Sequence, residues 1–147
     1  MTSNTTEARK GYGNTEQSRR NGSKLVYRQF TELTDAILGS AIDVHKAIGP
    51  GFTERVYAKA LQLELRQRGI LFVTEQTIRI KYKGQLLGTH RLDLIVNDSV
   101  VVELKAVYDI NNFHIAQMLS YLKASEKSVG LILNFSRATL EIKRVVQ

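Results

Sequence analysis

Apolar residues recur at helical spacing in two neighbouring segments, residues 30–48 and 52–68. In the first segment the apolar positions are Leu33, Ile37, Ala41, Val44 and Ile48. Gly49-Pro50-Gly51 breaks the chain between the segments, and Gly69 stands where a helix end favours a left-handed residue. The pattern therefore predicts two helices joined by a sharp turn.

Beyond Ile70 the apolar period changes to two, which predicts strands. Turn signals at 83–85 and 97–99 divide this part into a strand that ends at Tyr82 and strands over 86–96 and 100–107. A third helix is predicted from an N-cap at Asn111 or Asn112 through Lys123. Strands over 129–133 and 140–146 follow. This order predicts a single α/β (α+β) domain with a mixed β-sheet flanked by helices.

Residues 1–24 differ in composition from the rest of the chain. They are rich in Thr, Asn, Gly and Ser and contain few apolar residues, so we expect a disordered basic tail before a domain over 25–147. The whole chain has a net charge of +7, from 21 Lys and Arg against 14 Asp and Glu. This charge favours an anionic partner, with nucleic acid as the first choice.

The absence of cysteine excludes disulfides, zinc–thiolate sites, iron–sulfur clusters and Cys nucleophiles. It fits a reducing compartment, and we expect a cytoplasmic protein. No apolar run reaches the roughly 18 residues that a membrane span requires, so we expect no membrane partner. The polar beginning of the chain also lacks the pattern of a signal peptide.

Charged residues gather at one end of the predicted hairpin over 86–107. A turn at 97–99 places Asp93 opposite Glu103 and Arg91 opposite Lys105, all on one face. The other face is entirely apolar and consists of Leu92, Leu94, Val96, Val100, Val102 and Leu104. Opposed carboxylates repel each other, and one of the two would have a raised pKa.

A divalent cation would remove this conflict. Mg²⁺ takes hard oxygen ligands from one or two carboxylates, and it can supply a nucleophilic hydroxide beside a phosphoryl group. The alternative is an ion-pair cluster of the same four charges without a metal. A one-residue slip in register would separate the groups, so both interpretations depend on the predicted pairing.

Two signatures in the sequence resemble those of a known enzyme family. Asp93 followed by Glu103-Leu104-Lys105 resembles the D…(D/E)xK signature of the PD-(D/E)XK nuclease superfamily. Residues 51–57, GFTERVY, resemble the GxxExxY signature of a small bacterial and archaeal family within it. The resemblance extends from about Leu33 to Val146. Leu92 departs from the pattern, because the superfamily often has Pro at this position.

The resemblance implies a restriction-endonuclease-like domain that binds Mg²⁺, with Mn²⁺ as an alternative ion. Asp93 and Glu103 would be metal ligands, and Lys105 would position the attacking water. Glu54 would be an additional acidic residue of the catalytic site. Gln117 and Tyr121 resemble a Q-x-x-x-Y pair that supports the site or contacts DNA in relatives, so we count Gln117 as catalytic and Tyr121 as nucleic-acid-binding.

Simpler interpretations stay open for several of these residues. Glu54 is also explained as an exposed acid at a helix start, where the helix dipole favours it. Gln117 is also explained by a hydrogen bond to a strand end. We expect Tyr57 to pack in the core and His45 to have a structural role.

The leading hypothesis is a Mg²⁺-dependent nuclease that hydrolyses phosphodiester bonds, with DNA as the substrate by resemblance. Lys81, Lys83 and Arg91 would bind the phosphate backbone, which gives affinity without sequence reading. One alternative is a non-catalytic module for nucleic-acid binding or complex assembly that keeps the same fold. Another is a structural protein with an incidental ion cluster. Association with a second copy of the chain or with a protein partner stays open.

Overall fold

The computed structural model describes residues 14–147. The chain divides into two compact units, Met1–Leu33 and Thr34–Gln147. Helix α1, Asn14–Ile48, contains the described part of the first unit and the beginning of the second. No helix among the described residues is long and apolar enough to span a bilayer.

In the first unit, helix α1 begins inside the segment that we expected to be a disordered tail. Residues 14–24 are helical, whereas residues 1–13 of the expected tail lie outside the described residues. Opposite charges four residues apart support the helix, as in the pairs Arg20–Glu16 (3.4 Å) and Arg28–Glu32 (2.8 Å). The expectation of disorder came from the types of residues in this segment, and residue types alone do not show which charges lie four positions apart.

The second unit contains the mixed β-sheet that the sequence predicts, in the strand order β1-β2-β3-β4-β5. Strands β3 and β4 are parallel, and the other neighbours are antiparallel. The elements that follow α1 are α2 Glu54–Gln67, β1 Phe72–Tyr82, β2 Gln85–Val96, β3 Val100–Lys105, α3 Asn112–Ser125, β4 Val129–Asn134 and β5 Glu141–Val146. The predicted fold class is confirmed.

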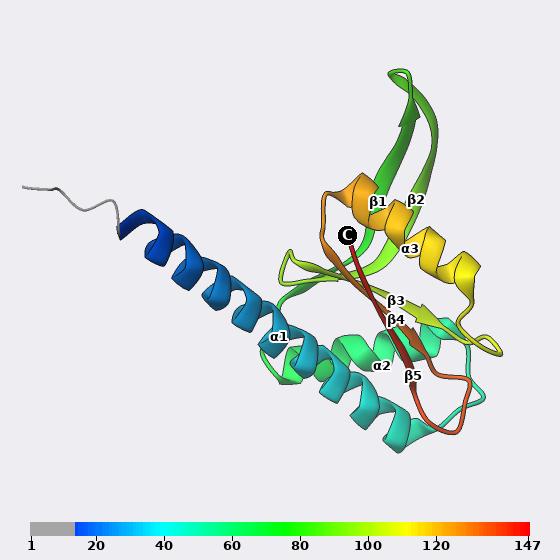
Figure 1. Cartoon of the computed structure of the whole chain (residues 1–147). Helices are drawn as coiled ribbons and strands as arrows, with labels where there is room; N and C mark the ends of the chain where they lie inside the picture. The colour runs from blue at the N-terminus through cyan, green and yellow to red at the C-terminus, as the bar shows by residue number, and fades with distance from the viewer. Residues whose placement is uncertain (1–13) are drawn as a thin grey trace, which may run out of the picture. The chain divides into compact units, whose positions relative to one another are not determined.

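Helices lie on both sides of β3, β4 and β5 (Figure 1). On one side, α3 contributes Met118, Tyr121 and Leu122 to a buried cluster that includes residues of all five strands. On the other side, Tyr57 of α2 stacks on Phe135, with ring centroids 4.4 Å apart. His45 Nε2 lies 2.8 Å from the carbonyl oxygen of Arg137. Tyr57 and His45 therefore have the packing roles that we expected.

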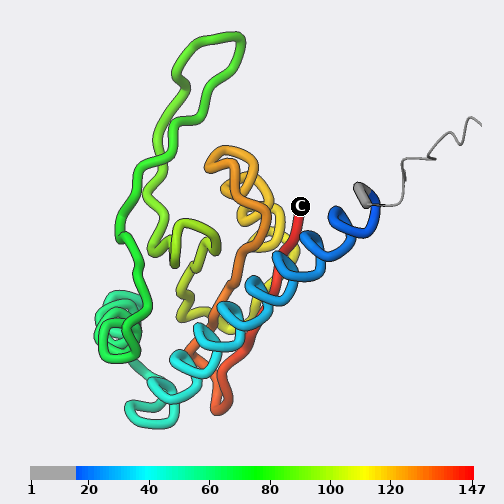
Figure 2. Tube along the Cα trace, turned by 90° about the vertical axis from the view of Figure 1, so that its left-hand side faces the viewer, coloured from blue at the N-terminus to red at the C-terminus, as the bar shows by residue number. Residues whose placement is uncertain are grey.

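Strands β1 and β2 form a hairpin whose outer part leaves the sheet (Figure 2). These two strands pair from Phe72↔Val96 to Tyr82↔Gln85, whereas β3 pairs with β2 only over residues 94–96. Residues 76–91 therefore form a two-stranded arm. Its turn has φ of 48° at Lys83 and 76° at Gly84, as the two-residue turns of tight hairpins require.

The alternation of faces along β2 is broken at Asp93. Leu92 packs in the α3 cluster together with Ile95, so it does not share a face with Leu94 as we expected. The pairing of β1 with β2 omits Asp93 and Glu75, and Glu75 has φ of 52°. Because of this irregularity, Leu92 lies on the face of the sheet opposite to the one that a strict period of two predicts.

The sequence predicted that strand β3 ends at Val107. In the structure it ends two residues earlier, at Lys105. The backbone N–H of Ala106 donates to Glu54 Oε1 at 3.2 Å, and that of Val107 donates to Asn134 Oδ1 at 3.1 Å. Side chains from α2 and β4 thus satisfy the backbone groups that a longer strand would pair. The third helix begins where expected, because Asn111 caps it by accepting from the N–H groups of Phe113 and His114.

Substituting Gly130 by Ala should destabilise the fold by about 1–3 kcal/mol, because the added Cβ overpacks the core. A Cβ at Gly130 would lie 2.8 Å from Met118 Cγ, and Met118 is a buried residue of α3. Urea unfolding measures the change. Gly88→Ala is the matched control, because nothing lies within 4 Å of a Cβ at Gly88. Equal effects of the two substitutions would contradict the prediction.

Candidate active site

Asp93 and Glu103 lie side by side where β2 diverges from β3. The backbone N–H of Asp93 donates to Glu103 Oε1 at 3.2 Å, and the N–H of Leu104 donates to Asp93 Oδ2 at 2.9 Å. Backbone pairing between the two strands ends at Leu94↔Val102. The predicted proximity of the two acids is confirmed, but carboxylate-to-backbone bonds replace the backbone pairing that we expected between them.

The pKa of Glu103 is raised to about 8. Burial is the main cause, since its side chain is only 6% exposed, and the neighbouring charge of Asp93 adds to the effect. The bond from the Asp93 N–H and the charge of Lys105 act in the opposite direction. At neutral pH and without a cation, Glu103 therefore keeps its proton.

Lys105 is held by a side chain of α3. Its Nζ donates to Gln117 Oε1 at 3.3 Å. Gln117 is also hydrogen-bonded to Tyr121, whose pKa is raised to about 12 by burial and then by the charges of Glu103 and Asp93. Tyr121 is 6% exposed and lies where it supports Gln117, and its expected contact with nucleic acid stays a prediction.

His90, which lacks a spaced partner in the sequence, is also a member of this group. Its ring stacks on that of Tyr121, with centroids 4.2 Å apart. The pKa of His90 is lowered, mainly by burial. The charge of Asp93 acts against this shift, and the charge of Lys105 adds to it. The lowered pKa favours the neutral imidazole. Its position three residues before Asp93 was a signal, but only the break in alternation at Asp93 turns both residues toward one site.

Glu54 begins α2 and lies beside the end of β3. Its Oε1 accepts from the N–H of Ala106, the residue that follows Lys105. Glu54 and Asp93 line one open cavity, together with Arg55, Ala58, Lys59, Gln62, Thr74 and Glu75. Arg55 and Lys59 were missed in the sequence, although their spacing of four residues places both on one face of α2.

The three cations expected to bind nucleic acid lie on the arm and not in the carboxylate cluster. Lys81, Lys83 and Arg91 are exposed. We expected Arg91 to lie opposite Lys105, but Arg91 pairs with Thr77 of β1. The reason is that β2 has already diverged from β3 at this position. With Arg79, the arm has four basic residues and no Asp or Glu over residues 76–91.

The four-charge ion-pair cluster is not formed. Among the described residues, no ion pair joins Arg91 or Lys105 to Asp93 or Glu103. Nor do three or more His, Cys, Asp or Glu side chains of this part of the chain form a metal-binding group. The donor set is the carboxylate pair alone. It fits Mg²⁺, which uses one or two carboxylates and keeps several waters.

Comparison with known families assigns the chain. A family model described as the PD-(D/E)XK nuclease superfamily matches residues 31–145. The chain belongs to this superfamily. The residues by which the sequence resembles the superfamily signature, Asp93, Glu103 and Lys105, lie together at the divergence of β2 and β3.

A solved structure has a similar fold. The structure titled "Crystal structure of SSO0001" is 18% identical, with a TM-score of 0.51. The match covers 63% of this chain and 49% of that chain, so the chain spans about half the length of SSO0001. At this identity the likeness concerns the fold alone. No curated protein matches the chain.

Glu103→Gln should remove a pH dependence of stability. Between pH 4.5 and about 8 the folded chain keeps a proton on Glu103 that the unfolded chain releases. The free energy of unfolding of the wild type should therefore fall as pH rises through this window, by about 2–4 kcal/mol. Urea unfolding in EDTA near both ends of the window measures this change.

The same titration with Glu103→Gln should give a nearly constant free energy of unfolding. Asp35→Asn is the control, because Asp35 is an exposed acid on α1. A wild-type profile that Glu103→Gln leaves unchanged would show that another group causes the pH dependence.

Proposed function

We propose that this member of the superfamily is a metal-dependent nuclease that hydrolyses phosphodiester bonds of nucleic acid, DNA in the first place. One observation carries the proposal. A buried carboxylate, Glu103, and a half-buried one, Asp93, lie side by side without an ion-pair partner, and Lys105 lies beside them. A stable ion-pair network would have neutralised the pair, whereas a cation-binding site requires it to be available.

Asp93 and Glu103 would hold Mg²⁺, with Mn²⁺ as the alternative ion. The bound ion would neutralise charge on the phosphoryl group and make a water molecule more acidic. Because Glu103 keeps a proton up to about pH 8, its affinity for the ion should rise with pH through this range.

The remaining residues of the site position the reacting groups. Gln117 holds the Lys105 ammonium, which would donate to the phosphate or to the attacking water. Tyr121 supports Gln117 from the core. Glu54 fixes the backbone directly after Lys105 and so sets where this side chain points. Arg55 and Lys59 place positive charge in the cavity beside Asp93, along a path for the phosphate backbone.

The carboxylate pair should bind the ion and be required for cleavage. Calorimetry should detect Mg²⁺ or Mn²⁺ binding to the wild type and its loss in Asp93→Ala/Glu103→Ala, together with loss of cleavage of labelled DNA. Asp35→Ala, which removes an exposed acid of α1, is the control for net charge. Absence of metal binding to the wild type, with and without DNA, would refute the nuclease.

Lys105→Met should reduce turnover more than binding. Loss of one donor to the reacting phosphate lowers kcat by about 10²–10³-fold, while the dissociation constant for DNA stays within a few fold. Single-turnover cleavage and fluorescence anisotropy measure the two quantities. Equal losses in both would favour the alternative of a binding module that keeps the fold without the activity.

The arm should supply phosphate contacts that do not depend on the metal. In EDTA, Lys81→Ala/Lys83→Ala should weaken duplex binding at low salt and reduce the slope of log K against log salt by about 0.9 per lost contact. Arg91→Ala should reduce this slope by the amount expected for one lost contact. Lys46→Ala, an exposed lysine in the last turn of α1, is the control. An unchanged slope would exclude the arm from the interface.

A further inference from the structure

Tyr108 is an aromatic residue exposed to solvent in the segment that follows the proposed active site along the chain. It lies three residues after Lys105, in the segment between β3 and α3, and its side chain is 86% exposed. Three residues span at most about 11 Å, so the Cα atoms of Tyr108 and Lys105 lie within this distance of each other. Among the large hydrophobic side chains of the described residues, Tyr108 has the highest exposed fraction.

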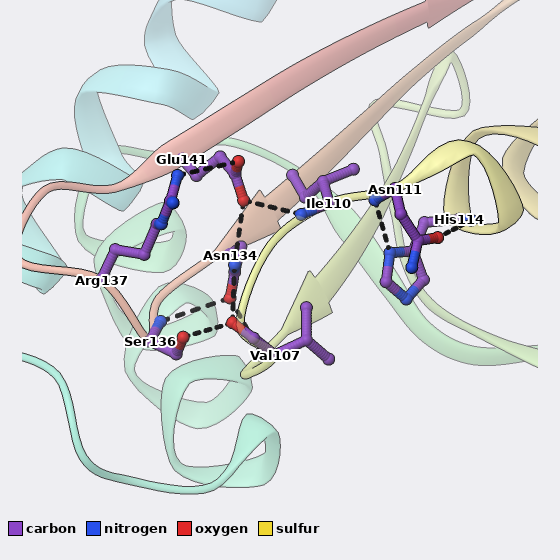
Figure 3. A network of polar contacts seen from close by, with 8 residues as sticks. All are labelled: Val107, Ile110, Asn111, His114, Asn134, Ser136, Arg137 and Glu141. Carbon is purple, nitrogen blue, oxygen red and sulfur yellow. Dashed lines mark hydrogen bonds and ion pairs between the residues drawn. The ribbon is translucent and has the colours of Figure 1, made fainter.

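The backbone on both sides of Tyr108 is fixed (Figure 3). Asn134, which is fully buried, accepts from the Val107 N–H at 3.1 Å and donates to the Val107 carbonyl at 2.9 Å. The Ile110 N–H donates to Glu141 Oε1 at 2.8 Å, and Asn134 Nδ2 donates to the same carboxylate at 3.0 Å. The ring is therefore presented by a rigid turn and cannot move into the core without breaking this network.

The same network places a cation against the ring. The Arg137 guanidinium lies 5.9 Å from the Tyr108 ring centroid, and its Nη1 contacts Glu141 Oε2 at 3.3 Å. The hydrogen bond from Asn134 is the main cause of the lowered pKa of Glu141, so this carboxylate stays ionised and retains Arg137. One carboxylate thus positions both the turn that carries Tyr108 and the cation behind its ring.

We infer that Tyr108, backed by Arg137, is a stacking site for an unpaired nucleobase next to the scissile phosphate. This inference rests on the proposed nuclease function and names its substrate class. An exposed aromatic ring beside a cation is the arrangement by which proteins bind single-stranded nucleic acid. Bases inside a duplex are already stacked on both faces, so the ring selects a strand with an unpaired segment at the site.

The absence of tryptophan from the chain permits a direct test. Tyr108→Trp introduces the only indole and retains a stacking surface. In EDTA, which prevents cleavage, a single-stranded thymidine oligomer should quench its fluorescence. An oligomer of the same length and charge with abasic sites should bind without quenching. Quenching by both oligomers, or by neither while anisotropy shows binding, would overturn the inference.

Affinity provides a second measurement. Tyr108→Ala should weaken binding of the thymidine oligomer by about 5- to 150-fold. It should leave the dissociation constant of the abasic oligomer unchanged. Leu63→Ala is the matched control, because it removes an exposed apolar side chain from α2. Equal effects of Tyr108→Ala on the two oligomers would contradict base stacking.

The outcomes for stacking and for cleavage are separable. Base-dependent quenching without cleavage in Mg²⁺ would refute the nuclease and retain a single-strand binding site. Cleavage without base-dependent quenching would retain the nuclease and refute the stacking site.

Discussion

Asp93 and Glu103 replace a backbone ladder at the point where β2 leaves β3. Each carboxylate accepts from a backbone N–H of the opposite strand, so the strands stay together over the distance at which their own pairing has ended. The two acids are thus part of the sheet as well as of the site. Because β2 diverges here, its continuation with β1 becomes the arm, and the irregularity at Asp93 turns Leu92 and His90 toward α3.

The end of β3 is satisfied in the same manner by side chains from other elements. Glu54 of α2 accepts from Ala106, and Asn134 of β4 bonds both backbone groups of Val107. Buried backbone groups require partners, so these side chains fix where the strand stops. Lys105 is the last residue of the strand, and its direction follows from this termination and from the bond to Gln117. The geometry of the site is therefore set by how backbone donors are satisfied.

The sequence predicted those features that depend on local periodicity. The order of helices and strands, the turn at 97–99 and the register of Leu94↔Val102 follow from spacing alone. It did not predict the face change at Leu92, because strict alternation has no place for the irregularity opposite Glu75. Nor did it predict the network of Asn134 and Glu141, whose partners lie far away along the chain and have no periodic relation to them.

The arrangement of charge separates a catalytic site from an incidental ion cluster. A cluster that served stability would place Lys105 or Arg91 on the carboxylates, whereas Lys105 bonds to a neutral amide and Arg91 lies on the arm. Glu103 is left with a raised pKa, and the fold loses stability as its proton is released. A non-catalytic binding module gains nothing from two adjacent acids, because they repel the phosphates that its basic arm attracts. The acidic pair is therefore the reason to propose an enzyme and not a module that only binds.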